Sequence, residues 1–176
     1  MIAHDFGGCV ALRAHLLHGA RYRRLALVDP VACGPGAPPS SAWSGSAAGS
    51  SNSSRRRSMR PWCASTSPPR VTPVCAPPRS TRWPWTTEEG QAAFYRQIAQ
   101  ADQRYTDEIQ PLYPSIDLPV TVCWGTEDTW IPFARGQELA ALIPGAWLVP
   151  VPEAGHLLPL DAPARLTSEL LAFLTA

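Results

Sequence analysis

The hexapeptide at residues 3–8, with the pattern small-x-Asp-x-small-small, is the feature that most constrains this sequence. Met1 and Ile2 before it are typical of the end of a buried strand. After it, residues 8–18 carry apolar side chains on one helical face, and Gly19 suits the end of a helix. The apolar run 25–28 predicts a second strand. A strand, a helix and a strand of these lengths predict a parallel βαβ unit whose first turn is the hexapeptide.

The stretch 33–87 differs in composition from the rest of the chain. It holds 12 Ser, 10 Pro and seven Arg, but no Asp, Glu, Leu, Ile or Phe. It shows no period of 2 or 3.6 and too little apolar surface to offset the entropy of ordering, so we expect a disordered Ser/Pro/Arg-rich insertion. All 15 basic residues of the chain are Arg, which points to a GC-rich coding sequence. We therefore hypothesise that residues 33 to about 85 are translated out of frame.

Regular patterns return after this stretch and continue to the end of the chain. Thr86 and Glu89 form a capping-box pattern, and apolar residues at helical spacing then predict one helix as far as Pro111. Apolar runs at 118–124 and 147–151 predict two more strands.

Proline and aspartate mark the boundaries of the last elements. Pro132 begins a predicted helix that ends at residues 144–145. Pro150 lies inside the last predicted strand, which favours an edge position in the sheet. Asp161 is expected to cap the final helix, whose apolar side chains share one face.

Three motifs in chain order carry the functional prediction. They are the hexapeptide with Asp5, the run Leu-Pro-Val-x-Val-x-Trp-Gly-x-x-Asp-x-x-Ile-Pro at 118–132 with Asp128, and Gly155-His156. Their order and spacing resemble the α/β-hydrolase family, in which a sharp strand-to-helix turn carries the nucleophile and the acid and His follow. Asp5 stands where many relatives have Ser, which resembles the haloalkane dehalogenase and epoxide hydrolase branch.

The resemblance implies a role for each matching residue. Asp5 would attack carbon as an ionised carboxylate, and His156, oriented by Asp128, would activate water against the resulting alkyl ester. The backbone N–H of Phe6 would be one oxyanion-hole donor. The three side chains would follow the C-terminal ends of parallel strands, where ligands bind in open α/β sheets. Three further residues are assigned to the substrate pocket: His4, Trp124 and Trp130.

The fold expected is therefore α/β, a partial α/β-hydrolase with a short parallel sheet and flanking helices. Residues 1–32 would form the nucleophile βα unit, 33–87 an irregular remnant of a cap, and 88–176 the C-terminal half of the core. Because the chain begins at the nucleophile turn, we expect the first half of the sheet, with its second oxyanion donor, to be missing. The halide-binding Trp that often follows the nucleophile in dehalogenases is Phe6 here.

The function expected is cleavage of a small organic halide or epoxide, without a cofactor or a metal. Two alternatives remain open: a catalytically inactive, truncated fragment of such a hydrolase, and an esterase-like relative. Asp29, which also ends a strand, and Glu127 are alternative positions for the acid. His15 and His18, on the first helix, are expected to be structural.

Charge and cysteine content limit the classes of partner and the compartment that we expect. The net charge of +1 combines +7 in residues 33–87 with −6 elsewhere, and the run Arg55–Arg57 lacks the aromatic or helical context of a nucleic-acid site. No run of 18 apolar residues and no secretory signal occur. Five cysteines without a C-x-x-C pair favour free thiols in a reducing compartment. We expect a cytoplasmic protein with a small-molecule substrate, no nucleic-acid or membrane partner, and an undetermined oligomeric state.

Overall fold

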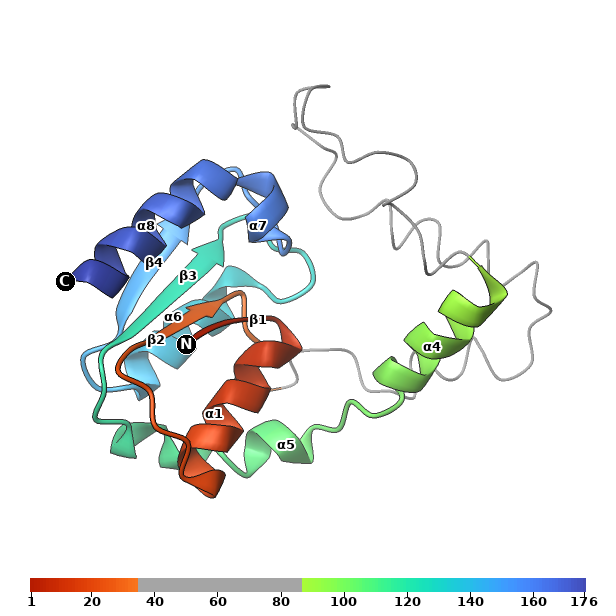
Figure 1. Ribbon diagram of the computed structural model, residues 1–176, viewed down its shortest axis with the longest axis horizontal. Coiled ribbons are helices and arrows are strands. Elements are labelled where there is room, and N and C mark those ends of the chain that lie inside the picture. The colour runs from red at the N-terminus through yellow and green to blue at the C-terminus, as the bar shows by residue number, and fades with distance from the viewer. Residues whose placement is uncertain (35–86) are drawn as a thin grey trace. The chain divides into compact units, whose positions relative to one another are not determined.

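Four short parallel strands form one sheet in the described part of the chain (Figure 1). The computed structural model describes residues 1–34 and 87–176. The strands lie side by side in sequence order, and each neighbouring pair is parallel. They are β1 (Ile2–His4), β2 (Leu25–Val28), β3 (Val120–Gly125) and β4 (Trp147–Val151). The predicted α/β class with a short parallel sheet is confirmed.

Helices connect and cover the strands within one unit made of residues 1–34 and 103–176. They are α1 (Phe6–His18), α5 (Arg104–Asp107), the 3-10 helix η2 (Gln110–Ser115), α6 (Phe133–Leu142), α7 (Leu158–Asp161) and α8 (Pro163–Thr175). Helix α4 (Glu88–Ile98) belongs to a second unit. The predicted insertion, its proposed frame shift and the run Arg55–Arg57 lie outside the described residues, apart from Cys33, Gly34 and Thr87 at its ends.

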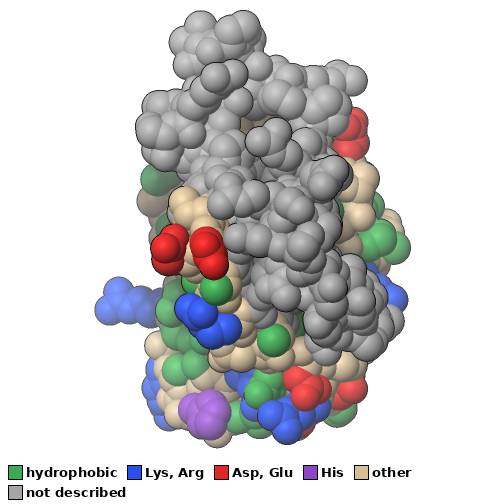
Figure 2. Space-filling view, turned by 90° about the vertical axis from the view of Figure 1, so that its right-hand side faces the viewer, with side chains coloured by type: hydrophobic (Ala, Val, Ile, Leu, Met, Phe, Trp, Pro, Cys, Tyr) green, Lys and Arg blue, Asp and Glu red, His purple; other side chains and the backbone are tan. Residues whose placement is uncertain are grey.

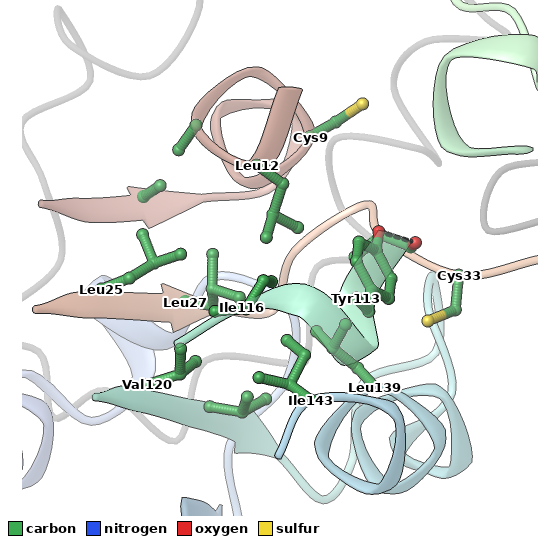
Figure 3. Packing of buried hydrophobic residues seen from close by; sticks show 14 of the residues in the cluster. Cys9, Leu12, Leu25, Leu27, Cys33, Tyr113, Ile116, Val120, Leu139 and Ile143 are labelled. Atoms are coloured by element: carbon green, nitrogen blue, oxygen red, sulfur yellow. Dashed lines mark hydrogen bonds between the residues drawn. The ribbon is translucent and has the colours of Figure 1, made fainter. Parts of the chain in front are cut away.

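The two central strands, β2 and β3, are buried on both faces of the sheet, and alternate residues of each strand point to opposite sides. Figure 3 shows the larger cluster, in which Leu12 of α1 points toward Leu27 of β2 and Leu139 of α6 lies beside Ile143. The other face of the sheet carries Val28 and contacts Leu166 of α8. Near-continuous apolar strands are therefore explained by burial on two sides, which parallel sheets require.

Two expectations about the strands and the first helix are confirmed. Strand β4 lies at one end of the described sheet, as Pro150 predicted. Gly19 ends α1 in the left-handed conformation, with φ of 70°, and its N–H is donated to Ala14 O.

The single helix predicted up to Pro111 is wrong, because the chain leaves helix α4 at Ile98 and begins α5 only at Arg104. The side chain of Gln103 donates to Thr106 Oγ1 and to Asp107 Oδ1, both at 2.9 Å, at the start of α5. These contacts begin a separate helix within the sheet unit, so the apolar spacing continues across a break in the backbone.

The two predicted helix caps have different outcomes. The Oγ1 of Thr87 accepts the Gly90 N–H at 3.0 Å at the start of α4, and Thr86 lies outside the described residues. Asp161 does not cap α8. It ends α7, and its Oδ2 accepts the Gly155 N–H at 2.9 Å. Pro163, which has no N–H to satisfy, occupies the first turn of α8 instead.

Helix α1 begins two residues earlier than predicted, directly after Asp5. A Cβ added at Gly8 would lie 2.3 Å from Pro30 Cβ, so the turn after β2 leaves no room for a side chain. At Gly7 an added Cβ would meet no described atom within 4 Å. The steric demand for a small residue in this turn therefore falls on Gly8.

We predict that Gly8→Ala lowers the free energy of unfolding by about 1–3 kcal/mol, because the new methyl group overpacks the contact with Pro30. Gly7→Ala, one residue away on the same helix, is the matched control and should not be destabilising. Urea unfolding followed by circular dichroism measures both. Equal stability of the two variants would contradict the close contact between α1 and Pro30.

Candidate active site

Asp5 lies between β1 and α1 in an unusual backbone conformation, with φ of 51° and ψ of −127°. Such conformations are costly for residues other than Gly and concentrate at functional sites. Its N–H is donated to Val28 O at 3.3 Å, and its carbonyl oxygen accepts the N–H groups of Gly8 at 2.9 Å and Val31 at 3.0 Å. Three main-chain hydrogen bonds therefore hold the turn and fix the backbone position from which the Asp5 side chain extends.

The three residues selected from the sequence motifs are brought together at the C-terminal ends of β1, β3 and β4. His156 Nδ1–H donates to Asp128 Oδ2 at 2.8 Å. On the other side of the ring, His156 Nε2 lies 3.5 Å from Asp5 Oδ1. The imidazole thus lies between two carboxylates, one on each ring nitrogen. The Asp128 and His156 side chains are buried, whereas the Asp5 side chain keeps 34% of its surface exposed.

Asp128 is held by its own loop as well as by His156. Its Oδ1 accepts the backbone N–H groups of Trp130 at 2.8 Å and Ile131 at 2.9 Å. This turn leaves Oδ2 directed at the imidazole. Both oxygens of the buried carboxylate are therefore satisfied, as a buried charge requires.

The pKa of His156 reflects opposing influences. Burial, the largest influence, lowers it, but hydrogen bonds to Asp128 and Asp5 and the charges of both carboxylates raise the pKa to about 9. With this pKa the ring is an imidazolium at neutral pH. Removing either negative charge would lower this pKa toward the range in which His accepts a proton.

The residues assigned to the pocket occupy different environments. The His4 ring lies 5.2 Å from the His156 ring, and its Nε2–H donates to His156 O at 2.8 Å. The ring of Trp130, which is partly buried, also lies against His156, with ring centroids 4.8 Å apart. The assignment of Trp124 to the pocket does not fit the structure. Its side chain is 1% exposed within the core, and its indole N–H donates to Ile131 O at 3.1 Å.

Phe6 occupies the first position of α1, where the N–H has no earlier helical turn to accept it. This N–H is adjacent to Asp5 at the positive end of the helix dipole. A negative charge that develops on an oxygen bound to the Asp5 side chain would be stabilised from this direction.

Two Asp side chains near the site make hydrogen bonds that the sequence did not predict. Asp29 Oδ1 accepts the Gly125 N–H at 2.9 Å, and Asp161 Oδ2 accepts the Gly155 N–H. Gly125 ends β3, before the Asp128 loop, and Gly155 directly precedes His156. The available sequence signal was an Asp at the end of a strand, which by itself does not reveal its hydrogen-bond partner.

The remaining candidates lie elsewhere. His15 Nδ1–H donates to Ala20 O at the end of α1, and His18 and Glu127 are exposed. Among residues 1–34 and 87–176, no group of three His, Cys, Asp or Glu side chains could hold a metal ion. The described cysteines are buried free thiols, at Cys9, Cys33 and Cys123.

The described surface and helices give two further findings. The face drawn in Figure 2 carries both acidic and basic side chains among the described residues. No helix in the described ranges is both long and apolar enough to cross a membrane.

This chain is similar to known proteins in sequence and in structure. Residues 1–169 match the Alpha/beta hydrolase family. The crystal structure of an alpha/beta hydrolase fold protein from Burkholderia ambifaria is 39% identical with a TM-score of 0.80, and the match covers 97% of this chain and 64% of that chain. No curated protein matches the sequence.

More distant solved structures share the fold. A meta-cleavage product hydrolase is 18% identical with a TM-score of 0.71, and covers 99% of this chain and 64% of its own. An N-acyl homoserine lactone degrading enzyme is 21% identical with a TM-score of 0.70, and covers 98% of this chain and 66% of its own. Of the Burkholderia protein described above, this chain spans 64% of the length.

We predict that Asp5→Asn lowers the pKa of His156 from about 9, because it removes one of the two carboxylates that raise it. The measurement is a pH titration of the His156 ring by NMR. Asp117→Asn, at an exposed residue remote from these contacts, is the control and should leave the titration unchanged. A His156 pKa that is the same in the wild type and in Asp5→Asn would show that the 3.5 Å contact does not exist in solution.

Proposed function

This chain belongs to the alpha/beta hydrolase family, and we propose that it is a hydrolase whose nucleophile is the carboxylate of Asp5. The single observation that carries the proposal is His156, hydrogen-bonded to Asp128 through Nδ1 and 3.5 Å from Asp5 Oδ1 through Nε2. The substrate class is a small organic halide or epoxide.

In the first step an Asp5 oxygen attacks an sp3 carbon of the substrate. A carbon–oxygen bond forms, and the bond from carbon to halide or to the epoxide oxygen breaks, with the electron pair leaving on that atom. A halide departs as the anion and His156 releases its proton to solvent, whereas an epoxide oxygen takes the proton from His156. Asp5 suits this step because a carboxylate needs no base to remove a proton first. Its partly exposed side chain and its fixed backbone support direct access by substrate.

In the second step water hydrolyses the ester on Asp5. Once Asp5 is esterified its negative charge is lost, so one influence that raises the pKa of His156 disappears while burial, which lowers that pKa, remains. His156 can then take a proton from water as the oxygen attacks the ester carbonyl. Asp128 stabilises the imidazolium that results. The tetrahedral intermediate then breaks its bond to the alkyl oxygen, which takes the proton from His156 and leaves as the alcohol. Asp5 returns as a carboxylic acid that carries one oxygen from water and loses its proton to solvent.

The backbone N–H of Phe6 would donate to the oxyanion formed during ester hydrolysis. Trp130 and His4 flank the His156 ring, and we assign both to the wall of the site rather than to proton transfer. Trp124 is left out of this assignment because it is part of the core.

Two alternatives are tested with the same proposal. One is that this chain, which spans 64% of its Burkholderia relative, holds the site residues without turning over substrate. The other is that this chain is an esterase-like relative that has lost a Ser nucleophile. Neither alternative forms an alkyl ester on Asp5, so detection of that ester separates them from the proposal.

We predict that His156→Gln forms the ester but does not hydrolyse it. Incubation with 1-bromobutane or styrene oxide should add the mass of one substrate-derived group to the peptide that contains Asp5, as measured by mass spectrometry. Turnover by the wild type should exceed that of His156→Gln by a factor of at least about 100, the usual contribution of a general base.

Asp5→Ala is the matched control, and it should give neither the adduct nor turnover. In water labelled with oxygen-18, wild-type turnover should place the label in the Asp5 carboxylate. Turnover by Asp5→Ala would overturn the proposed nucleophile. Absence of both adduct and turnover in folded wild type and His156→Gln would favour the inactive alternative.

A further inference from the structure

Asp29 is fully buried at the end of β2, beneath the two loops of the candidate site. Its backbone N–H is donated to Cys123 O at 3.0 Å, and its φ is 39°, in the region that favours Gly. Its Oδ1 accepts the Gly125 N–H, while Oδ2 has no hydrogen-bond partner among the described residues. A strained, buried acid with one unpaired oxygen requires an explanation.

Gly125 is the point at which both loops meet. A Cβ added there would lie 2.4 Å from Ala154 O and 2.5 Å from Gly155 O, so the end of β3 packs directly on the chain before His156. The Glu127 N–H also donates to Ala154 O at 2.9 Å. A group that fixes Gly125 therefore fixes the start of the Asp128 loop and the approach to His156 together.

We propose that Asp29 is a positioning residue that keeps its proton in the folded protein and, through its bond to Gly125, aligns Asp128 with His156. This role depends on the proposed function in one respect, because Asp128 and His156 are taken to be the residues that act together in ester hydrolysis. The alignment itself is a property of the fold and can be measured without turnover.

The charges around Asp29 favour the protonated acid. Burial is the largest influence and raises its pKa, the hydrogen bond from Gly125 lowers it, and the negative charges of Asp128 and Asp161 raise it further. His156 acts in the opposite direction, and the resulting pKa is about 8. The Cys123 thiol beside it also has a raised pKa, about 11, chiefly from burial, so it adds no charge at neutral pH.

A neutral Asp29 suits the site in one further respect. An ionised carboxylate there would be a third negative charge near His156, added to Asp128 and Asp5. It would hold the imidazolium more tightly and oppose its use as a base. A protonated acid gives the same hydrogen-bond acceptor to Gly125 without that charge.

Asp29→Asn is the sharpest variant, because an amide oxygen keeps the acceptor for Gly125 while the side chain stays neutral at every pH. In wild-type protein labelled with carbon-13 at aspartate, the Asp29 carboxyl signal, assigned by its absence in Asp29→Asn, should be that of an acid at pH 6. The Gly125 amide proton should shift with a midpoint near pH 8 in the wild type and not in the variant. An ionised Asp29 at pH 6 would overturn the proposal.

The unfolding equilibrium gives an independent measurement. Because the pKa of Asp29 is raised on folding, the stability it contributes is full below about pH 4 and is lost as pH rises through 8. The ratio of the wild-type unfolding constant to that of Asp29→Asn should therefore increase about tenfold per pH unit between pH 5 and 7. Asp117→Asn, an exposed Asp, should show a constant ratio. A constant ratio for Asp29→Asn would contradict a protonated Asp29.

The positioning role predicts a spectroscopic difference between two variants. The His156 Nδ1–H signal, shifted by its bond to Asp128, should be retained in Asp29→Asn and lost or displaced in Asp29→Ala, which has no acceptor for Gly125. A folded Asp29→Ala with the wild-type signal would overturn the role. If Asp29→Ala does not fold, the pH titration of the Gly125 amide proton decides. An amide proton whose chemical shift does not follow the ionisation of Asp29 would also overturn the proposed link between Asp29 and Gly125.

Discussion

The backbone of Asp5 is the constraint on which the candidate site depends. A residue with a Cβ held at φ of 51° and ψ of −127° costs on the order of 1–3 kcal/mol, so the neighbouring structure must stabilise it. It does so through main-chain bonds to Val28, Gly8 and Val31, which belong to the next strand, the following helix and the turn after β2. Because these partners come from three elements, the turn forms only when β1, α1 and β2 have assembled.

The parallel sheet accounts for the meeting of residues that lie far apart in the chain. The C-terminal ends of parallel strands share one edge, and Asp5, Asp128 and His156 each follow such an end. The register of the strands alone does not position two side chains accurately enough to form the 2.8 Å hydrogen bond between His156 and Asp128. Finer contacts come from Asp side chains whose oxygens accept backbone N–H groups: Asp161 from Gly155, Asp128 from Trp130 and Ile131, and Asp29 from Gly125.

Much of this architecture could be predicted from the sequence, because it depends on local pattern. The strands, Gly19 and the edge position of β4 follow from apolar runs, glycine and proline. The grouping of the three motif residues follows from their places after strands. The catalytic roles given to them remain a prediction.

The differences between prediction and structure arise where tertiary contacts override a local pattern. Apolar spacing continued past Ile98, although the backbone breaks before Arg104 and enters a different unit. Asp161 has the sequence position of a helix cap but bonds to Gly155, a partner that no local pattern specifies. Trp124 stands in the motif that carries Asp128, yet strand alternation turns it into the core.

The indole of Trp124 has a consequence for how this fold can diversify. Its N–H reaches forward to Ile131 O, while Asp128 binds the N–H groups at the end of the same loop, so residues 125–131 form a closed, internally bonded segment. Surface loops usually accept insertions and deletions, and new specificities commonly arise there. A change of length here would separate Trp124 from Ile131 and leave a buried indole donor without an acceptor. Variation in loop length among proteins built on this core is therefore expected to be excluded from this segment and to accumulate elsewhere.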